Sequence, residues 1–258
     1  MLGGFDSWQQ AARRPATTRT LRRYQLGRFA RDHPDPGRTD TSELAGWLGR
    51  QAWSAETMRS YRATLRVFYR WALLTGQVAA DPAALLPPIR PPQHLARPCP
   101  DDVWRRAAMT APARVRLAIL LAARQGLRCG EVARARREDL RADLGGVSLV
   151  VLGKGDRLRV VPLDDDMARM VRQAEAGWLF PGPSGHLSPN HLGRLVSAQL
   201  GPRWTMHTLR HRFATVSYRG TDDLCTVQQL LGHSKVETTR GYVQVAADAL
   251  RAGVVAAR

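Results

Sequence analysis

Apolar residues recur every three or four positions in three segments of the first part of the chain, at 17–33, 41–51 and 54–76. This spacing predicts amphipathic helices. Ser54 is a suitable N-cap for the third helix, and an acid in its first turn complements the helix dipole. We therefore predict a helical domain over residues 1–92.

A proline-rich segment, residues 87–100, predicts an extended linker to a second domain, residues 93–258. In that domain two β-type runs flank the turn GKGD and predict a hairpin over 145–163. Helical spacing is found at 100–109, 115–126, 130–140, 164–177, 188–200, 207–220, 223–233 and 234–245. The predicted fold class is mainly α with a small antiparallel β-sheet (α+β).

The net charge of the chain indicates what kind of partner it binds. Lys and Arg number 39 against 22 Asp and Glu, and the net charge of +17 favours a polyanion such as DNA or RNA. No apolar run approaches the ~18 residues of a membrane span, and the N-terminus lacks the apolar stretch of a signal peptide. Cys99, Cys129 and Cys225 form no CxxC pair, which indicates a reducing, cytoplasmic setting without structural zinc.

Arginines recur along the third predicted helix, where Glu56 is the only acid. This pattern favours a face that follows DNA phosphates, with an ordinary solvated helix face as the alternative. The residues concerned are Arg59, Arg62, Arg66 and Arg70.

Polar residues of the second domain stand out as candidates for chemistry, although each has an ordinary structural explanation when taken alone. Arg128, in GLRCGE, would be a salt-bridge or capping residue, and Lys154 a solvated turn residue. His233 would be a helix end, and Tyr242 a packed aromatic.

Metal and nucleotide sites find little support. His207 and His211 lie four apart like a pair of metal ligands, but HTLRH lacks the Glu of HExxH, and Arg210 between them repels a cation. Consecutive aspartates at 164–166 suit the first turn of a helix, because adjacent helical positions point in different directions. The chain has no GxxxxGK[ST] loop. We expect no metal and no cofactor.

Taken together, the candidate residues match the needs of phosphodiester transfer without a metal. Arg128 and Arg210 can hold the non-bridging oxygens of a phosphate through bidentate hydrogen bonds. Tyr242 offers a phenol, which is mostly neutral at pH 7 and needs a nearby His as it attacks. Lys154, one of two lysines among 39 basic residues, suits the role of acid for the departing 5′-oxygen, whereas Arg holds its proton too tightly.

Four segments in this order resemble the tyrosine recombinases, the phage integrase family that includes the Xer recombinases. They are GLRCGEVARARREDL, VLGKGDRLRVVPL, HTLRHRFAT and LLGHSKVETTRGYV, which span Gly126 to Val243. The resemblance implies a helical core-binding domain followed by a catalytic domain, with Glu131 organising the site. The catalytic residues that it implies are Arg128, Lys154, His207, Arg210, His233 and Tyr242.

The resemblance also implies a role for each catalytic residue. The two arginines would clamp the scissile phosphate, and His233 would orient it. His207 would act as general acid/base and assist Tyr242, which would form a 3′-phosphotyrosyl bond. Lys154 would protonate the 5′-hydroxyl leaving group. The phosphotyrosyl bond retains the energy of the broken phosphodiester, so neither ATP nor a divalent metal would be needed.

The family's mode of assembly implies the partners. Its two domains form a C-shaped clamp on double-stranded DNA, and a homotetramer acts on two DNA sites through a Holliday junction. Little room exists ahead of Thr17 for an arm-binding domain, so a short two-domain member is expected. An accessory directionality factor is left open, as is docking of the tail after Tyr242 on a neighbour or on its own domain. The expected location is the cytoplasm of a bacterial host, at the nucleoid.

The leading functional hypothesis is a site-specific DNA recombinase that integrates and excises a phage or other mobile element. A Xer-type chromosome-dimer resolvase shares the chemistry and is the nearest alternative. A type IB topoisomerase would use similar groups as a monomer, without synapsis. A non-catalytic helix-turn-helix protein is the alternative from another class, and it leaves Arg128, Lys154 and HTLRH unexplained.

Overall fold

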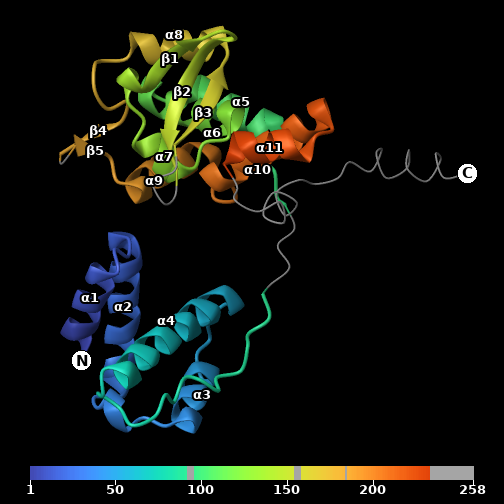
Figure 1. The fold of residues 1–258 in the computed structure, drawn as a ribbon. Helices are drawn as coiled ribbons and strands as arrows, with labels where there is room; N and C mark the ends of the chain where they lie inside the picture. The colour runs from blue at the N-terminus through green and yellow to red at the C-terminus, as the bar shows by residue number, and fades with distance from the viewer. Residues whose placement is uncertain (92–95, 154–157, 184, 233–258) are drawn as a thin grey trace, which may run out of the picture. The chain divides into compact units, whose positions relative to one another are not determined.

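A computed structural model describes residues 1–91, 96–153, 158–183 and 185–232. The chain divides into two compact units, Met1–Gln93 and His94–Arg258 (Figure 1). The boundary between the units falls in the proline-rich segment, whose described residues form neither helix nor strand.

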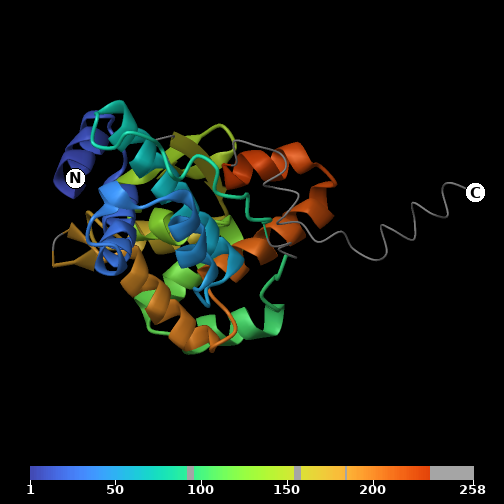
Figure 2. The ribbon, with the colours of Figure 1, turned by 90° about the horizontal axis from the view of Figure 1, so that it is seen from below.

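The regular elements among the described residues of the first unit are all helices. The unit contains α1 (Leu2–Ala11), α2 (Ala16–Asp32), a 3₁₀ helix (Pro36–Arg38), α3 (Thr41–Gly49) and α4 (Ala55–Leu74). Helices α1, α2 and α4 pack against one another (Figures 1 and 2). The last three α-helices match the predicted segments, whereas α1 was not among the segments singled out by periodicity.

Local sequence fixes where α3 and α4 begin. The hydroxyl of Ser54 accepts a hydrogen bond from the backbone N–H of Thr57 and caps α4, as predicted. Asp40 and Glu43 form a reciprocal capping box at the start of α3. The core beneath is aromatic, with Phe68 fully buried.

The second unit is also mostly helical, and its helices lie close to the predicted segments. They are α5 (Asp101–Thr110), α6 (Ala113–Gln125), α7 (Cys129–Ala133), α8 (Asp165–Gln173), α9 (Pro189–Leu200), α10 (Met206–Thr221) and α11 (Leu224–Leu231). Ser188 caps α9 with Pro189 at its first position, and Asp164 caps α8 by accepting the N–H of Met167. The predicted helix over 234–245 lies outside the described residues. In the described ranges, no helix is long and apolar enough to cross a membrane.

The sheet is larger than the predicted hairpin. Strands β2 (Gly146–Leu152) and β3 (Leu158–Leu163) pair antiparallel, with Leu149 opposite Val161, and form that hairpin. A third strand, β1 (Leu140–Asp143), pairs antiparallel with β2. The segment 130–140 was predicted as one helix, but α7 ends at Ala133 and a 3₁₀ helix (Arg137–Asp139) leads into β1. The other sheet among the described residues has two strands, β4 (Pro181–Gly182) and β5 (Gly185–His186).

The core of the second unit forms around α6. Its apolar residues are buried on nearly every side, because α5, α9 and α10 pack against it together with β3 (Figure 1). Helix α8 packs on β2 and β3. Since α6 lies at the centre, the turn that follows it has a defined position, and the site begins at that turn.

Candidate active site

The turn after α6 depends on a glycine. Gly126 ends the helix in the left-handed conformation, with φ 67°. A Cβ atom at this position would overlap three atoms of the Phe213 ring on α10. Glycine therefore satisfies both the backbone conformation and the close approach of α10. The turn places Arg128 at the N-terminal end of α7, as the cap residue.

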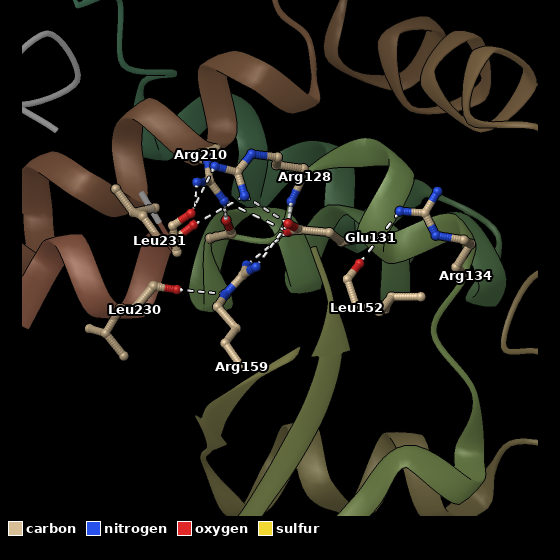
Figure 3. A network of polar contacts seen from close by, with 10 residues as sticks. Arg128, Glu131, Arg134, Leu152, Arg159, Arg210, Leu230 and Leu231 are labelled. Carbon is tan, nitrogen blue, oxygen red and sulfur yellow. Dashed lines mark hydrogen bonds and ion pairs between the residues drawn. The ribbon is translucent and has the colours of Figure 1, made fainter. Parts of the chain in front are cut away.

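Glu131 lies at the centre of the site. It belongs to the first turn of α7, and its side chain is only 2% exposed. The carboxylate accepts the backbone N–H of Arg128 at 2.7 Å and the Nη1 of the same residue at 2.7 Å. Glu131 thus caps its own helix and orients the guanidinium of Arg128 (Figure 3).

Two further arginines meet the same carboxylate. Arg159 on β3 donates from Nη1 and Nη2 to the two oxygens of Glu131, both at 2.8 Å. The Nη1 of Arg210 on α10 lies 3.8 Å from Oε2 of Glu131. We call Arg128, Glu131, Arg159 and Arg210 the arginine–glutamate cluster. It joins residues of α7, β3 and α10 (Figure 3).

The C-terminal end of α11 rests on this cluster. Helix α11 ends at Leu231, and its C-cap is Gly232, which has φ 63°. Carbonyl oxygens at this end of the helix have no partner within the helix and carry the negative end of its dipole, so cationic donors stabilise them. The carbonyls of Leu230, Leu231 and Gly232 accept hydrogen bonds from the guanidiniums of the cluster. His233 follows in the sequence and lies outside the described residues.

The surrounding charges set the protonation state of Glu131. Burial alone would raise the pKa of its carboxyl, but the hydrogen bonds and charge of Arg159, followed by the backbone and side-chain hydrogen bonds from Arg128, outweigh burial. The pKa falls from 4.5 to about 2, so the group is ionised at neutral pH. The cluster thus contains one carboxylate and three guanidiniums, leaving positive charge in excess.

The two predicted phosphate-clamping arginines differ in exposure. The side chain of Arg128 is 34% exposed, so its guanidinium is accessible at the surface. The side chain of Arg210 is 1% exposed, and it donates to the carbonyls of Gly126 and Leu231. The structure therefore brings both arginines to Glu131, one at the surface and one beneath it.

The other predicted catalytic residues are placed less fully. His207 is exposed on α10, one turn before Arg210, and its ring lies 4.5 Å from that of His211 between centroids. Lys154, His233 and Tyr242 lie outside the described residues. Arg159 was missed by the sequence reasoning. The available signal was its position in β3, where it shares the inward-facing side of the strand with apolar residues although it is charged.

The predicted DNA-binding arginines occupy different environments on α4. Arg59 is exposed and pairs with Glu56 at 3.1 Å. Arg62 donates from Nε and Nη2 to the carbonyl of Leu86 and so holds the chain that follows the helix. A surface groove of about 550 Å³ runs along α4. It is lined by the exposed Arg66 and Arg70, by Arg62, and by Trp8 and Arg14 from the α1 region.

Known proteins resemble this chain over most of its length. Residues 104–248 match the sequence profile of the Phage integrase family. The tyrosine recombinase XerC of Xanthomonas axonopodis pv. citri is 31% identical over 214 residues, which cover 76% of this chain and 70% of that protein.

Solved structures resemble it as well. The integrase of mycobacterium phage Brujita is 27% identical, with a TM-score of 0.52, covering 97% of this chain and 96% of that one. A lambda integrase tetramer bound to a Holliday junction has a TM-score of 0.74 at 18% identity, covering 94% of this chain and 76% of that one, and shares the fold.

Proposed function

Since the chain belongs to the phage integrase family of tyrosine recombinases, we propose that it integrates and excises a phage or other mobile element at specific DNA sites. Members of this family are DNA strand-transferring enzymes, and the chain is a site-specific recombinase of this type. We propose further that it acts in the cytoplasm of a bacterial host on double-stranded DNA.

The proposed reaction exchanges one phosphoester for another. The phenolic oxygen of Tyr242 attacks the scissile phosphorus as the bond to the 5′-oxygen breaks, leaving a 3′-phosphotyrosyl link. His207 accepts the phenolic proton, and Lys154 gives a proton to the departing 5′-oxygen. His233 donates a hydrogen bond to the phosphate. A 5′-hydroxyl from a second duplex reverses the step and joins the exchanged strands.

The arrangement of the arginine–glutamate cluster is the observation that supports this proposal most. Arg128 and Arg210 are far apart in sequence, yet both guanidiniums lie at the carboxylate of Glu131. Negative charge builds up on the non-bridging oxygens of a phosphate under attack, and fixed guanidiniums stabilise that charge without reorganising. The excess positive charge of the cluster suits a phosphodiester, and the partly exposed side chain of Arg128 gives that phosphate its first contact.

We propose that the helical unit holds DNA through its groove on α4. Arg66 and Arg70 are exposed there, and Arg14 and Arg62 add two further positive charges, against the single carboxylate of Asp81. Arg59 is paired with Glu56 outside the groove, so we assign it a smaller share of phosphate binding. Together with the catalytic unit this would form the clamp that the family resemblance implies, with four protomers acting on two sites.

A Xer-type chromosome-dimer resolvase is the second candidate function. It is favoured by the 31% identity to XerC of Xanthomonas, against 27% to the integrase of phage Brujita. Sequencing the DNA junctions formed when the gene and its flanking DNA enter a host separates the two. Junctions between the flanking DNA and a host site support an integrase. Junctions that join two copies of one chromosomal site support the resolvase.

The junctions also supply the substrate for a direct test. A duplex with that site and a nick just beyond the scissile phosphate traps the covalent intermediate, because the short 5′-hydroxyl strand diffuses away. We expect the purified chain to form an adduct in EDTA without ATP, and Tyr242→Phe to form none. An adduct formed equally by Tyr242→Phe, or a strict requirement for a divalent metal, would overturn the proposed mechanism.

A further inference from the structure

Arg159 occupies a position in β3 that a hydrophobic residue would ordinarily fill. Along this strand Val161 and Leu163 face inward and are buried, and Arg159 shares their face. Its side chain is 11% exposed. A guanidinium so buried is costly unless its donors are satisfied. The partners of the Arg159 guanidinium therefore indicate the function of this buried charge.

Each nitrogen of the Arg159 guanidinium has a partner. The two terminal nitrogens bind the two oxygens of Glu131 at 2.8 Å, and Nε donates to the carbonyl of Leu230 at 3.1 Å (Figure 3). This planar fork fits a carboxylate in a way that an ammonium group cannot. Arg159 thus ties β3 both to α7 and to the end of α11.

The chain passes closely over Arg159 where α11 ends. A Cβ atom at Gly232 would lie 2.9 Å from Cδ of Arg159 and 3.1 Å from its Nη1. Glycine is needed at this position both for the close approach and for the left-handed φ of 63°. The side chain of Arg159 therefore forms part of the surface on which the residue before His233 rests.

The charge of the cluster depends on Arg159. Glu131 would otherwise offset the charge of Arg128, the partly exposed guanidinium that is proposed to meet the phosphate. Arg159 binds both carboxylate oxygens and supplies a compensating charge from the buried side. With it, the cluster has two positive charges in excess; without it, one. A developing phosphate dianion is stabilised better by the first arrangement.

We infer that Arg159 is a positioning residue for strand cleavage: it compensates Glu131 and fixes the end of α11, so that Arg128 keeps its place and its charge toward the phosphate. This inference rests on the proposed function. It names a residue that acts through Arg128 and Glu131 and does not itself touch DNA.

The test measures adduct formation on the nicked duplex at saturating enzyme, with DNA affinity measured separately. We expect Arg159→Met to slow the single-turnover rate constant by about 10- to 100-fold, since removal of a donor to a developing oxyanion itself costs ~10²–10³. The Kd for the same duplex should change by less than about threefold. Arg159→Lys retains the charge and should recover part of the rate.

A paired substitution distinguishes charge compensation from ordinary structural support. Arg159→Met combined with Glu131→Gln removes one charge of each sign and restores the original excess, so it should react faster than Arg159→Met alone. A purely structural role predicts the opposite, because more hydrogen bonds are lost. The matched control uses Asp166 and Arg169, which form an exposed ion pair at 3.0 Å. Arg169→Met, alone or combined with Asp166→Asn, should leave the rate constant for adduct formation unchanged.

Each outcome has a defined meaning. If wild-type protein forms no adduct, the proposed function fails and not merely this inference. If wild-type protein reacts and Arg159→Met reacts equally fast, the inference is wrong. It is also wrong if the paired variant is slower than Arg159→Met, or if rate and DNA binding fall together. If Arg159→Met does not fold, Arg159→Lys and the paired variant decide: both slower than wild type, with normal DNA affinity, support the inference.

Discussion

Replacing Glu131 by Gln removes the charge around which the site is built while keeping the size of the side chain. The carboxylate receives hydrogen bonds from the backbone and side chain of Arg128 and from both terminal nitrogens of Arg159. An amide can accept at one oxygen only, and its NH₂ group faces donors that it cannot pair with. Buried guanidiniums would be left without their counter-charge.

The magnitude follows from the pKa of this carboxyl. A fall from 4.5 to about 2 on folding corresponds to about 3 kcal/mol of stability at neutral pH. Removing one partner of a buried ion pair typically lowers the free energy of unfolding by ~3–5 kcal/mol, in agreement with this value. Because the folded-state pKa is the lower one, this contribution is present above pH 4.5 and is lost as pH falls toward 2. The difference between wild type and Glu131→Gln should therefore shrink over that interval.

Hydrogen exchange of the buried amides in α6 measures unfolding of this unit alone. At pH 7 we expect Glu131→Gln to reduce the free energy of unfolding by about 3 kcal/mol. The control is Glu175→Gln, at an exposed glutamate of the same unit, with an expected change within ~0.5 kcal/mol. A loss below ~1 kcal/mol for Glu131→Gln, or a difference that stays constant between pH 5 and pH 3, would refute the reasoning.

Two further predictions concern the turn after α6 and the groove on α4. Gly126→Ala should reduce the free energy of unfolding, measured in urea, by about 2–5 kcal/mol, because of the left-handed φ and the overlap with Phe213. Gly76→Ala is the control, since Gly76 has the same backbone conformation but open space around it. It should reduce the free energy of unfolding by only ~1–2 kcal/mol. Arg66→Gln with Arg70→Gln should flatten the slope of log K against log salt by about 2 in DNA-binding titrations, whereas an unchanged slope places the DNA elsewhere.

Periodicity predicted most helices because their buried faces and caps are local properties of the sequence. Ser54 was predicted to cap a helix and does so, and the helix predicted from residue 188 is capped by Ser188. The segment 130–140 was assigned wrongly, because its charged residues suit a helix while its last residue pairs with β2. Main-chain pairing with the strand that follows the turn decides that outcome, and residue types within the segment do not report it.

The site was predicted only in part for a similar reason. Arg128, Glu131 and Arg210 were singled out by the family motifs, and the structure brings their side chains together. Neither the contacts of Arg159 nor the support of α11 by guanidiniums could be read from spacing, because these contacts join segments far apart in the chain. A charge at an inward-facing strand position was the one local sign of them.

The attachment point between protein and DNA tests the central claim most directly. The covalent adduct formed on the nicked duplex is digested with trypsin and nuclease, and the peptide that carries nucleotide is sequenced by mass spectrometry. We predict a nucleotide 3′-phosphate on Tyr242, together with release of a strand bearing a 5′-hydroxyl. Attachment at another residue, a 5′-phosphate linkage, or cleavage without any covalent protein–DNA species would contradict the account.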